Sequence, residues 1–76
     1  MSELPCLTGQ EVIAAFEKLG FSVDRINRSH HIMKKPGHEY LLSVPVHSGK
    51  TLKPGTLRRL IRDAGVSVDA FVALLG

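Results

Sequence analysis

The spacing of apolar residues changes from helical to alternating and back to helical along this chain, and this order restricts the fold more than any other feature. Thr8 and Glu11 match a capping box, in which each side chain satisfies a backbone N–H at a helix start. Leu7 is placed to pack on the first helical turn as a hydrophobic staple, and Gly20 is suited to end the helix. The pattern predicts a helix over Thr8–Leu19, whose apolar face consists of Val12, Ile13, Phe16 and Leu19.

Three segments with strand-like patterns follow this helix. Apolar and polar side chains alternate over Phe21–Arg25, and His30–Lys35 and Glu39–Val46 are predicted as the second and third strands. Asn27–Ser29 and Pro36–Gly37 contain the residues that favour turns between them. Because the connections are short, the three strands are expected to form an antiparallel meander.

The C-terminal part returns to helical spacing. A loop over His47–Lys53 leads to Pro54, which suits the first turn of a helix. The apolar stripe of this helix is Leu57, Leu60, Ile61 and Ala64, and Gly65 suits its end. Ser67 can cap a last short helix, which carries the apolar residues Val68, Phe71, Val72 and Leu75.

These elements predict an α+β fold in a single domain, because 76 residues provide only one modest core. The apolar stripes are buried if two helices pack on one face of a three-stranded antiparallel sheet. The other face of the sheet is then open. The short C-terminal helix is expected to pack on this core.

Charge and cysteine content narrow the classes of protein and partner. A net charge of +3 mildly favours polyanionic partners, and the single cysteine, Cys6, excludes an internal disulfide framework. The N-terminal segment Met1–Pro5 lacks the basic and apolar regions of a signal peptide. The longest apolar run, Ala70–Leu75, is too short to span a bilayer. The expected location is the cytoplasm.

The histidines do not match a metal site. Adjacent residues of a strand point to opposite faces, so His30 and His31 cannot easily share a metal ion. No cysteine or acidic cluster accompanies the four histidines. Gly49-Lys50-Thr51 resembles the end of a phosphate-binding P-loop, but Val44 stands where that motif requires glycine. We therefore expect neither a metal nor another cofactor.

After these exclusions, the candidate functional site that remains is a histidine near basic groups. Arg25, Arg28, Lys34 and Lys35 are close to His30 in sequence, and Lys50 and Lys53 precede the N-terminus of the second helix. A helix N-terminus with added lysines favours phosphate. RNA cleavage by the ribose 2′-OH needs a base, an acid and positive charge, and histidine with lysine or arginine can supply them without a metal.

Several alternatives to this interpretation remain open from the residues alone. The lysines can be ordinary solvated charges, and a lone histidine is more often structural than catalytic. The same basic surface can serve a non-catalytic RNA-binding module, or the chain can be a protein-interaction domain. A stacking platform for single-stranded RNA is poorly supported, because aromatic residues are only 5% of the chain. Met33 and Tyr40 are expected in the core or on a sheet face.

The sequence resembles the HicA (YcfA-like) family of mRNA interferase toxins over Leu7–Ser67. Four short blocks in the family's order carry the resemblance, followed by Ala64-Gly65. The blocks are Ser29-His30-His31-Ile32-Met33, Val44-Pro45-Val46-His47, Gly49-Lys50 and Leu52-Lys53-Pro54-Gly55-Thr56-Leu57. The resemblance implies a fold like that of a double-stranded-RNA-binding domain. It also implies metal-independent cleavage of mRNA, which inhibits translation, and a HicB-type antitoxin that blocks the toxin.

The resemblance also implies roles for particular residues. The first histidine of the family's Gly-Ser-His motif is catalytic, and here it is His30. We expect Arg28, Ser29, Lys50 and Lys53 to bind RNA. Arg28 stands where the family usually has glycine, so it either adds a phosphate contact or alters the turn. A homodimer within the toxin–antitoxin complex is a further alternative that the sequence leaves open.

Overall fold

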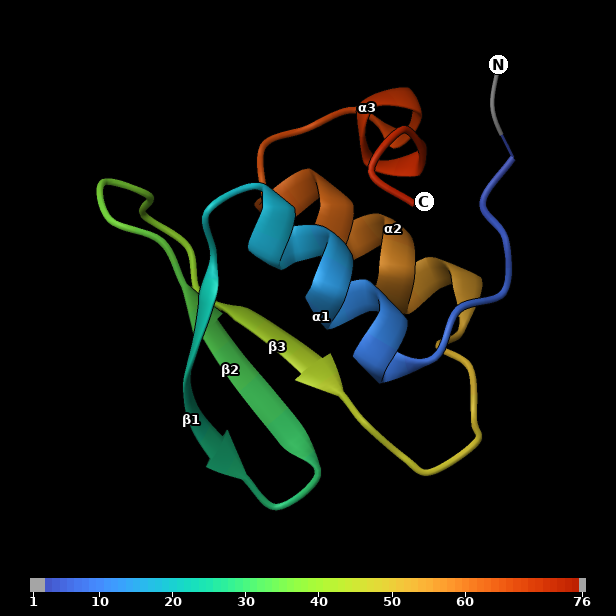
Figure 1. Cartoon of the computed structure of the whole chain (residues 1–76), viewed down its shortest axis with the longest axis horizontal. Helices are drawn as coiled ribbons and strands as arrows, with labels where there is room; N and C mark the ends of the chain where they lie inside the picture. The colour runs from blue at the N-terminus through green and yellow to red at the C-terminus, as the bar shows by residue number, and fades with distance from the viewer. Residues whose placement is uncertain (1–2, 76) are drawn as a thin grey trace.

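A computed structural model describes residues 3–75, in which α1 and α2 cover one face of a three-stranded sheet and α3 packs on α2 (Figure 1). The predicted α+β order is confirmed, including the extra C-terminal helix. Met1 and Ser2, and the end of the expected 1–76 domain at Gly76, lie outside the described residues. The elements are α1 Gly9–Lys18, β1 Ser22–Asn27, β2 His30–Lys34, β3 Leu42–Pro45, α2 Pro54–Asp63 and α3 Val68–Val72.

The ends of α1 form as its sequence predicts. The Thr8 hydroxyl accepts a hydrogen bond from the Glu11 backbone N–H at 3.3 Å, and the Glu11 carboxylate accepts one from the Thr8 N–H at 2.9 Å. This is the predicted capping box. Gly20 follows the helix with a φ of 99°, a left-handed conformation that favours glycine. Leu7 and Val12 are both buried, as expected for the staple.

The sheet has the strand order β1-β2-β3 and is antiparallel throughout. Side chains on the helix side of β2 and β3 are buried or half-buried, and they are His31, Met33, Leu42 and Val44. Because side chains alternate between faces, the opposite, open face carries His30, Ile32, Lys34, Ser43 and Pro45. The predicted open face is thus present, and Met33 is a core residue as expected.

Two strand boundaries differ from the prediction by more than one residue. β1 continues to Asn27, which pairs with His30, so the turn before β2 is shorter than expected. The third strand begins only at Leu42, whereas Glu39 was the predicted start. The chain makes a turn after β2, closed by a hydrogen bond from the His38 N–H to the Lys35 carbonyl at 3.0 Å. The residues that follow this turn contact α2 instead of continuing the sheet.

That contact explains why the residues before Leu42 leave the sheet. Nε2 of His38 lies 2.7 Å from the backbone carbonyl of Asp63 at the end of α2, which can only accept, so the ring donates. The His38 ring also packs edge-on against Phe21 at 5.2 Å between centroids. The placement of Tyr40 in the core or on a sheet face was wrong: its side chain is 58% exposed in this loop.

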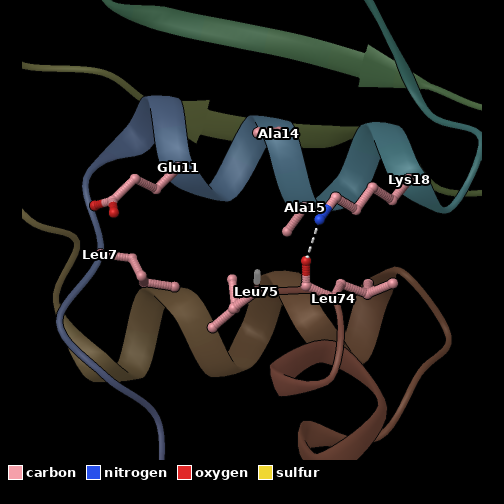
Figure 2. Close-up of a pocket in the computed structure, with 7 residues that line it drawn as sticks. All are labelled: Leu7, Glu11, Ala14, Ala15, Lys18, Leu74 and Leu75. Carbon is pink, nitrogen blue, oxygen red and sulfur yellow. Dashed lines mark hydrogen bonds between the residues drawn. The ribbon is translucent and has the colours of Figure 1, made fainter.

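The core is continuous from the sheet to α3. The ring of Phe16 on α1 packs against Phe71 of α3 at 5.3 Å between centroids, and both residues are fully buried. The segment after α3 returns to α1, where Nζ of Lys18 donates to the Leu74 carbonyl at 2.6 Å (Figure 2). The C-terminal helix is therefore part of the packed domain. In the described part of the chain, no helix has the length and apolar character of a membrane span.

The starts of α1 and α2 are held together near the end of β3. A Cβ on Gly9 would meet the Pro45 carbonyl oxygen, so α1 begins directly on β3. Thr8 and Thr51 form an isolated antiparallel bridge, and the Leu52 N–H donates to the Leu7 carbonyl at 2.8 Å. This pairing fixes the loop between β3 and α2, which carries Lys50 and Lys53.

Candidate nucleic-acid interface

His30 lies at the start of β2, on the open face of the sheet. It is exposed, and it pairs with Asn27 on one side and Pro45 on the other. His31 pairs with Val44 and lies on the opposite, helix-covered face. The prediction that the two histidines point apart is confirmed. Of the two, His30 is the one that a large ligand can reach.

A depression of about 350 Å³ lies beside this position. It is lined by Pro45, His47, Lys50, Thr51, Leu52, Lys53 and Thr56. Residues directly opposite in an antiparallel pair have Cβ atoms about 4.5–5.5 Å apart, so Pro45 connects His30 to this depression. Through this pairing, His30 lies opposite a residue that lines the same depression as Lys50 and Lys53, which come some twenty positions later in the chain.

The N-terminus of α2 borders the depression and has no side-chain cap. Thr8 caps α1 and Ser67 caps α3, but the N-cap residue of α2 is Lys53, whose side chain makes no cap hydrogen bond. Its first turn also contains no acidic residue. The unpaired N–H groups and the positive end of the helix dipole therefore face the same region as Lys50 and Lys53. Such an end attracts anions.

The cations near His30 divide into two groups. Lys34 lies 3.0 Å and Arg25 3.8 Å from the carboxylate of Asp24, so their charges are partly compensated. Within residues 3–75, Arg28, Lys50 and Lys53 have no ion-pair partner. Lys35 has no ion-pair partner in this range either, but its Nζ lies 5.7 Å from the centre of the Phe21 ring. The uncompensated charge closest to the depression is thus on the β1–β2 turn and at the start of α2.

Arg28 occupies the first position of the two-residue turn between β1 and β2. Its φ is 59°, in the left-handed region, and the structure describes no other non-glycine residue with a positive φ. Glycine is preferred at such a position in short hairpins, which gives a physical reason for the family's glycine. Ser29 uses its carbonyl oxygen to accept a hydrogen bond from the Val46 N–H at 2.8 Å. The turn is therefore formed with arginine present.

We expect Arg28→Gly to raise the free energy of unfolding by about 1 kcal/mol, because an L-residue in the left-handed region is strained by about 1–2 kcal/mol, partly offset by the entropy of glycine. Arg28→Ala removes the same charge but keeps the strain, and it serves as the matched control. Urea denaturation of the three proteins measures the difference. Equal stability of the two variants would show that the turn is not strained.

Most of the residues that line the depression were not among the predicted site residues, and His47 and Thr56 are two of them. His47 and Thr56 border the depression together with the two lysines. Both residues belong to the blocks that carry the family resemblance, but their sequence neighbours do not indicate that they line one site. Among residues 3–75, no three His, Cys, Asp or Glu side chains gather closely enough to hold a metal ion.

The molecule is thus a small basic α+β domain with an open sheet face, and an exposed histidine on that face lies beside a depression rich in uncompensated cations. The chain belongs to the HicA toxin family: the family model described as the HicA toxin of bacterial toxin–antitoxin systems matches residues 9–66. A search of curated proteins gives no match. The family assignment makes the chain a toxin of a toxin–antitoxin pair, which implies an antitoxin partner.

Proposed function

We propose that this toxin is a metal-independent endoribonuclease that cleaves mRNA and inhibits translation, with His30 as a general acid or base. The observation that carries the proposal is the cross-strand pairing of His30 with Pro45, which borders the basic depression at the uncapped start of α2. A proton-transfer group and a phosphate-binding surface are thereby adjacent. Both are required for cleavage of a phosphodiester by the neighbouring 2′-OH.

The proposed reaction uses the substrate's own nucleophile. The 2′-oxygen attacks the adjacent phosphorus while a base removes the hydroxyl proton, and the bond from phosphorus to the 5′-oxygen breaks as an acid protonates that oxygen. The products are a 2′,3′-cyclic phosphate and a 5′-hydroxyl. Histidine can perform either proton transfer near neutral pH, and nearby cations stabilise the charge on the phosphorane oxygens.

The proposed RNA contacts follow from the uncompensated charges. Lys50 and Lys53 bind phosphate together with the α2 N-terminus, and Arg28 and Ser29 contact the backbone on the other side of His30. These contacts recognise charge and shape rather than base edges. Sequence preference is therefore expected to be weak.

The function is tested with purified protein and a defined single-stranded RNA in the presence of a chelator. We expect cleavage into discrete fragments. Salt-sensitive RNA binding without any fragments would instead support the non-catalytic RNA-binding module on the same surface. Absence of both binding and cleavage would contradict both functions and leave a protein-interaction domain.

Replacing Lys50 and Lys53 together by alanine is expected to weaken RNA binding. The dependence of log affinity on log salt should become shallower by about 0.7 for each lost phosphate contact on single-stranded RNA. The control is Lys18→Ala with Arg62→Ala, which removes the same charge from the last turns of α1 and α2. Binding titrations at several salt concentrations measure both slopes. Equal slopes for the two double variants would contradict a local phosphate site.

The partner and location follow the same proposal. The antitoxin is of the HicB type and blocks the toxin by binding it, and the pair acts in the cytoplasm, where mRNA is translated. A homodimer within the complex stays a prediction. Size measurement of the purified toxin alone and with its antitoxin tests it.

A further inference from the structure

We propose that His47 is the second proton-transfer group of this site, acting on the opposite side of the scissile phosphate from His30. The inference rests on the proposed ribonuclease function and adds a catalytic residue to it. It is carried by the position of His47 relative to the β2–β3 pairing and by its place in the surface depressions.

The pairing of β2 and β3 extends one residue beyond the strands. His30 pairs with Pro45, and the hydrogen bond from the Val46 N–H to the Ser29 carbonyl continues the same register. Val46 is half-buried against the start of α1, where a Cβ on Gly9 would contact its side chain. Because side chains alternate between the two faces along an extended segment, Pro45 and His47 lie on the same face as His30. His47 is then the diagonal neighbour of His30, at a separation of about 7–8 Å.

The side chain of His47 is accessible, and its backbone is held in place by a hydrogen bond. It is exposed, and it lines both the basic depression and a second depression of about 320 Å³ bounded by Thr8, Gly9, Gln10, Val46, Ser48 and Gly49. Its carbonyl accepts a hydrogen bond from the Lys50 N–H at 2.9 Å, which closes the turn. Its ring makes no hydrogen bond or ion pair within residues 3–75. His47 is the residue that the linings of the two depressions share.

Two histidines at this separation fit the geometry of the reaction. The attacking 2′-oxygen and the leaving 5′-oxygen lie on opposite sides of phosphorus in an in-line displacement. The base and the acid each need to be within about 3 Å of their own oxygen, so one group cannot reach both at once. One neutral histidine takes the 2′-OH proton and one protonated histidine gives a proton to the 5′-oxygen, so the protons balance with no other reactant.

The charged groups that we expect near His47 belong to three segments of the chain. Lys50 and Lys53 share its depression before α2, Arg28 is on the adjacent β1–β2 turn, and His30 is on β2. The start of α1 contributes Gln10 and no titratable side chain to the second depression. A phosphate bound among these cations would lie between the two imidazoles.

The test compares the parent, His47→Ala and Ser48→Ala, which alters the same turn, by kcat/KM for RNA cleavage across pH. We expect His47→Ala to lose about 10²–10⁴-fold in kcat/KM. We also expect the bell-shaped pH profile of the parent to lose one limb. Ser48→Ala should keep both the kcat/KM of the parent and its bell-shaped pH profile. Thermal unfolding of each variant verifies the fold.

A second substrate separates proton transfer from a structural role. A ribonucleoside 3′-(p-nitrophenyl phosphate) has a leaving group that needs no protonation. If the two histidines divide the tasks, the variant that lacks the acid regains most of the parent's rate on this ester, and the variant that lacks the base does not. Equal losses of His30→Ala and His47→Ala on both substrates, or full activity of His47→Ala on RNA, would overturn the inference. An inactive parent would instead refute the proposed function.

Discussion

His30→Ala is expected to lower the rate of RNA cleavage by about 10²–10⁴-fold, the usual contribution of a general acid or base. Cells that express this variant should grow although the toxin is present. The fold should be retained, because His30 is exposed at the start of β2, and such surface changes usually alter stability by less than about 0.5 kcal/mol. Cleavage rates, growth curves and thermal unfolding measure the three effects.

The neighbouring histidine offers a matched control. His31→Ala makes the same chemical change one residue along the strand, but on the helix-covered face. It removes Nδ1, a buried nitrogen without a hydrogen-bond partner in the described part of the chain, so no hydrogen bond is lost with it. This variant should cleave RNA within a few-fold of the parent. Parent-level toxicity of a folded His30→Ala protein would contradict the catalytic role.

Phe71→Ala is expected to destabilise the domain by about 3–5 kcal/mol, as for other buried phenylalanines. Phe71 is fully buried on α3 and packs against Phe16, so its loss leaves a cavity in the centre of the core. A domain of this size has a total stability of roughly 4–11 kcal/mol. The loss is therefore a large fraction of the total stability, and the variant should unfold at a much lower denaturant concentration than the parent.

Denaturant unfolding of Phe71→Ala and Val72→Ala measures this effect. Val72 is adjacent on the same helix but only half-buried, so its truncation should cost much less. The comparison tests whether α3 belongs to the folded unit, since α3 follows the segment matched by the family model. A loss below about 1 kcal/mol for Phe71→Ala would indicate that α3 contributes little to the domain.

The elements with strong local signals were predictable from the sequence. The capping box of Thr8 and Glu11 gave the start of α1, and Pro54 marked the first residue of α2. The third strand was predicted too long, because the segment around His38 is determined by a contact with α2 that is distant in sequence. Tyrosine has a high β-propensity, but the segment of Tyr40 does not pair with another strand. Local propensity does not contain this information.

The sequence indicated some residues of the candidate site, whose roles stay predictions, but it did not indicate their arrangement. A phosphate-binding role for Lys50 and Lys53 was expected from their place before a helix. The depression that they share with Pro45, and through it their proximity to His30, depends on the register of β2 and β3, which is a tertiary property. His47 was missed for the same reason. Its position on the face of His30 becomes apparent only when the pairing is known.

The most direct test of the central claim is an analysis of the RNA ends that the purified parent protein produces, with a chelator present. Cleavage through the 2′-OH with histidine as the proton-transfer group predicts 2′,3′-cyclic phosphates and 5′-hydroxyls, and no such products from His30→Ala. Fragments with 3′-hydroxyls and 5′-phosphates, or the same fragments from the folded His30→Ala variant, would contradict the account.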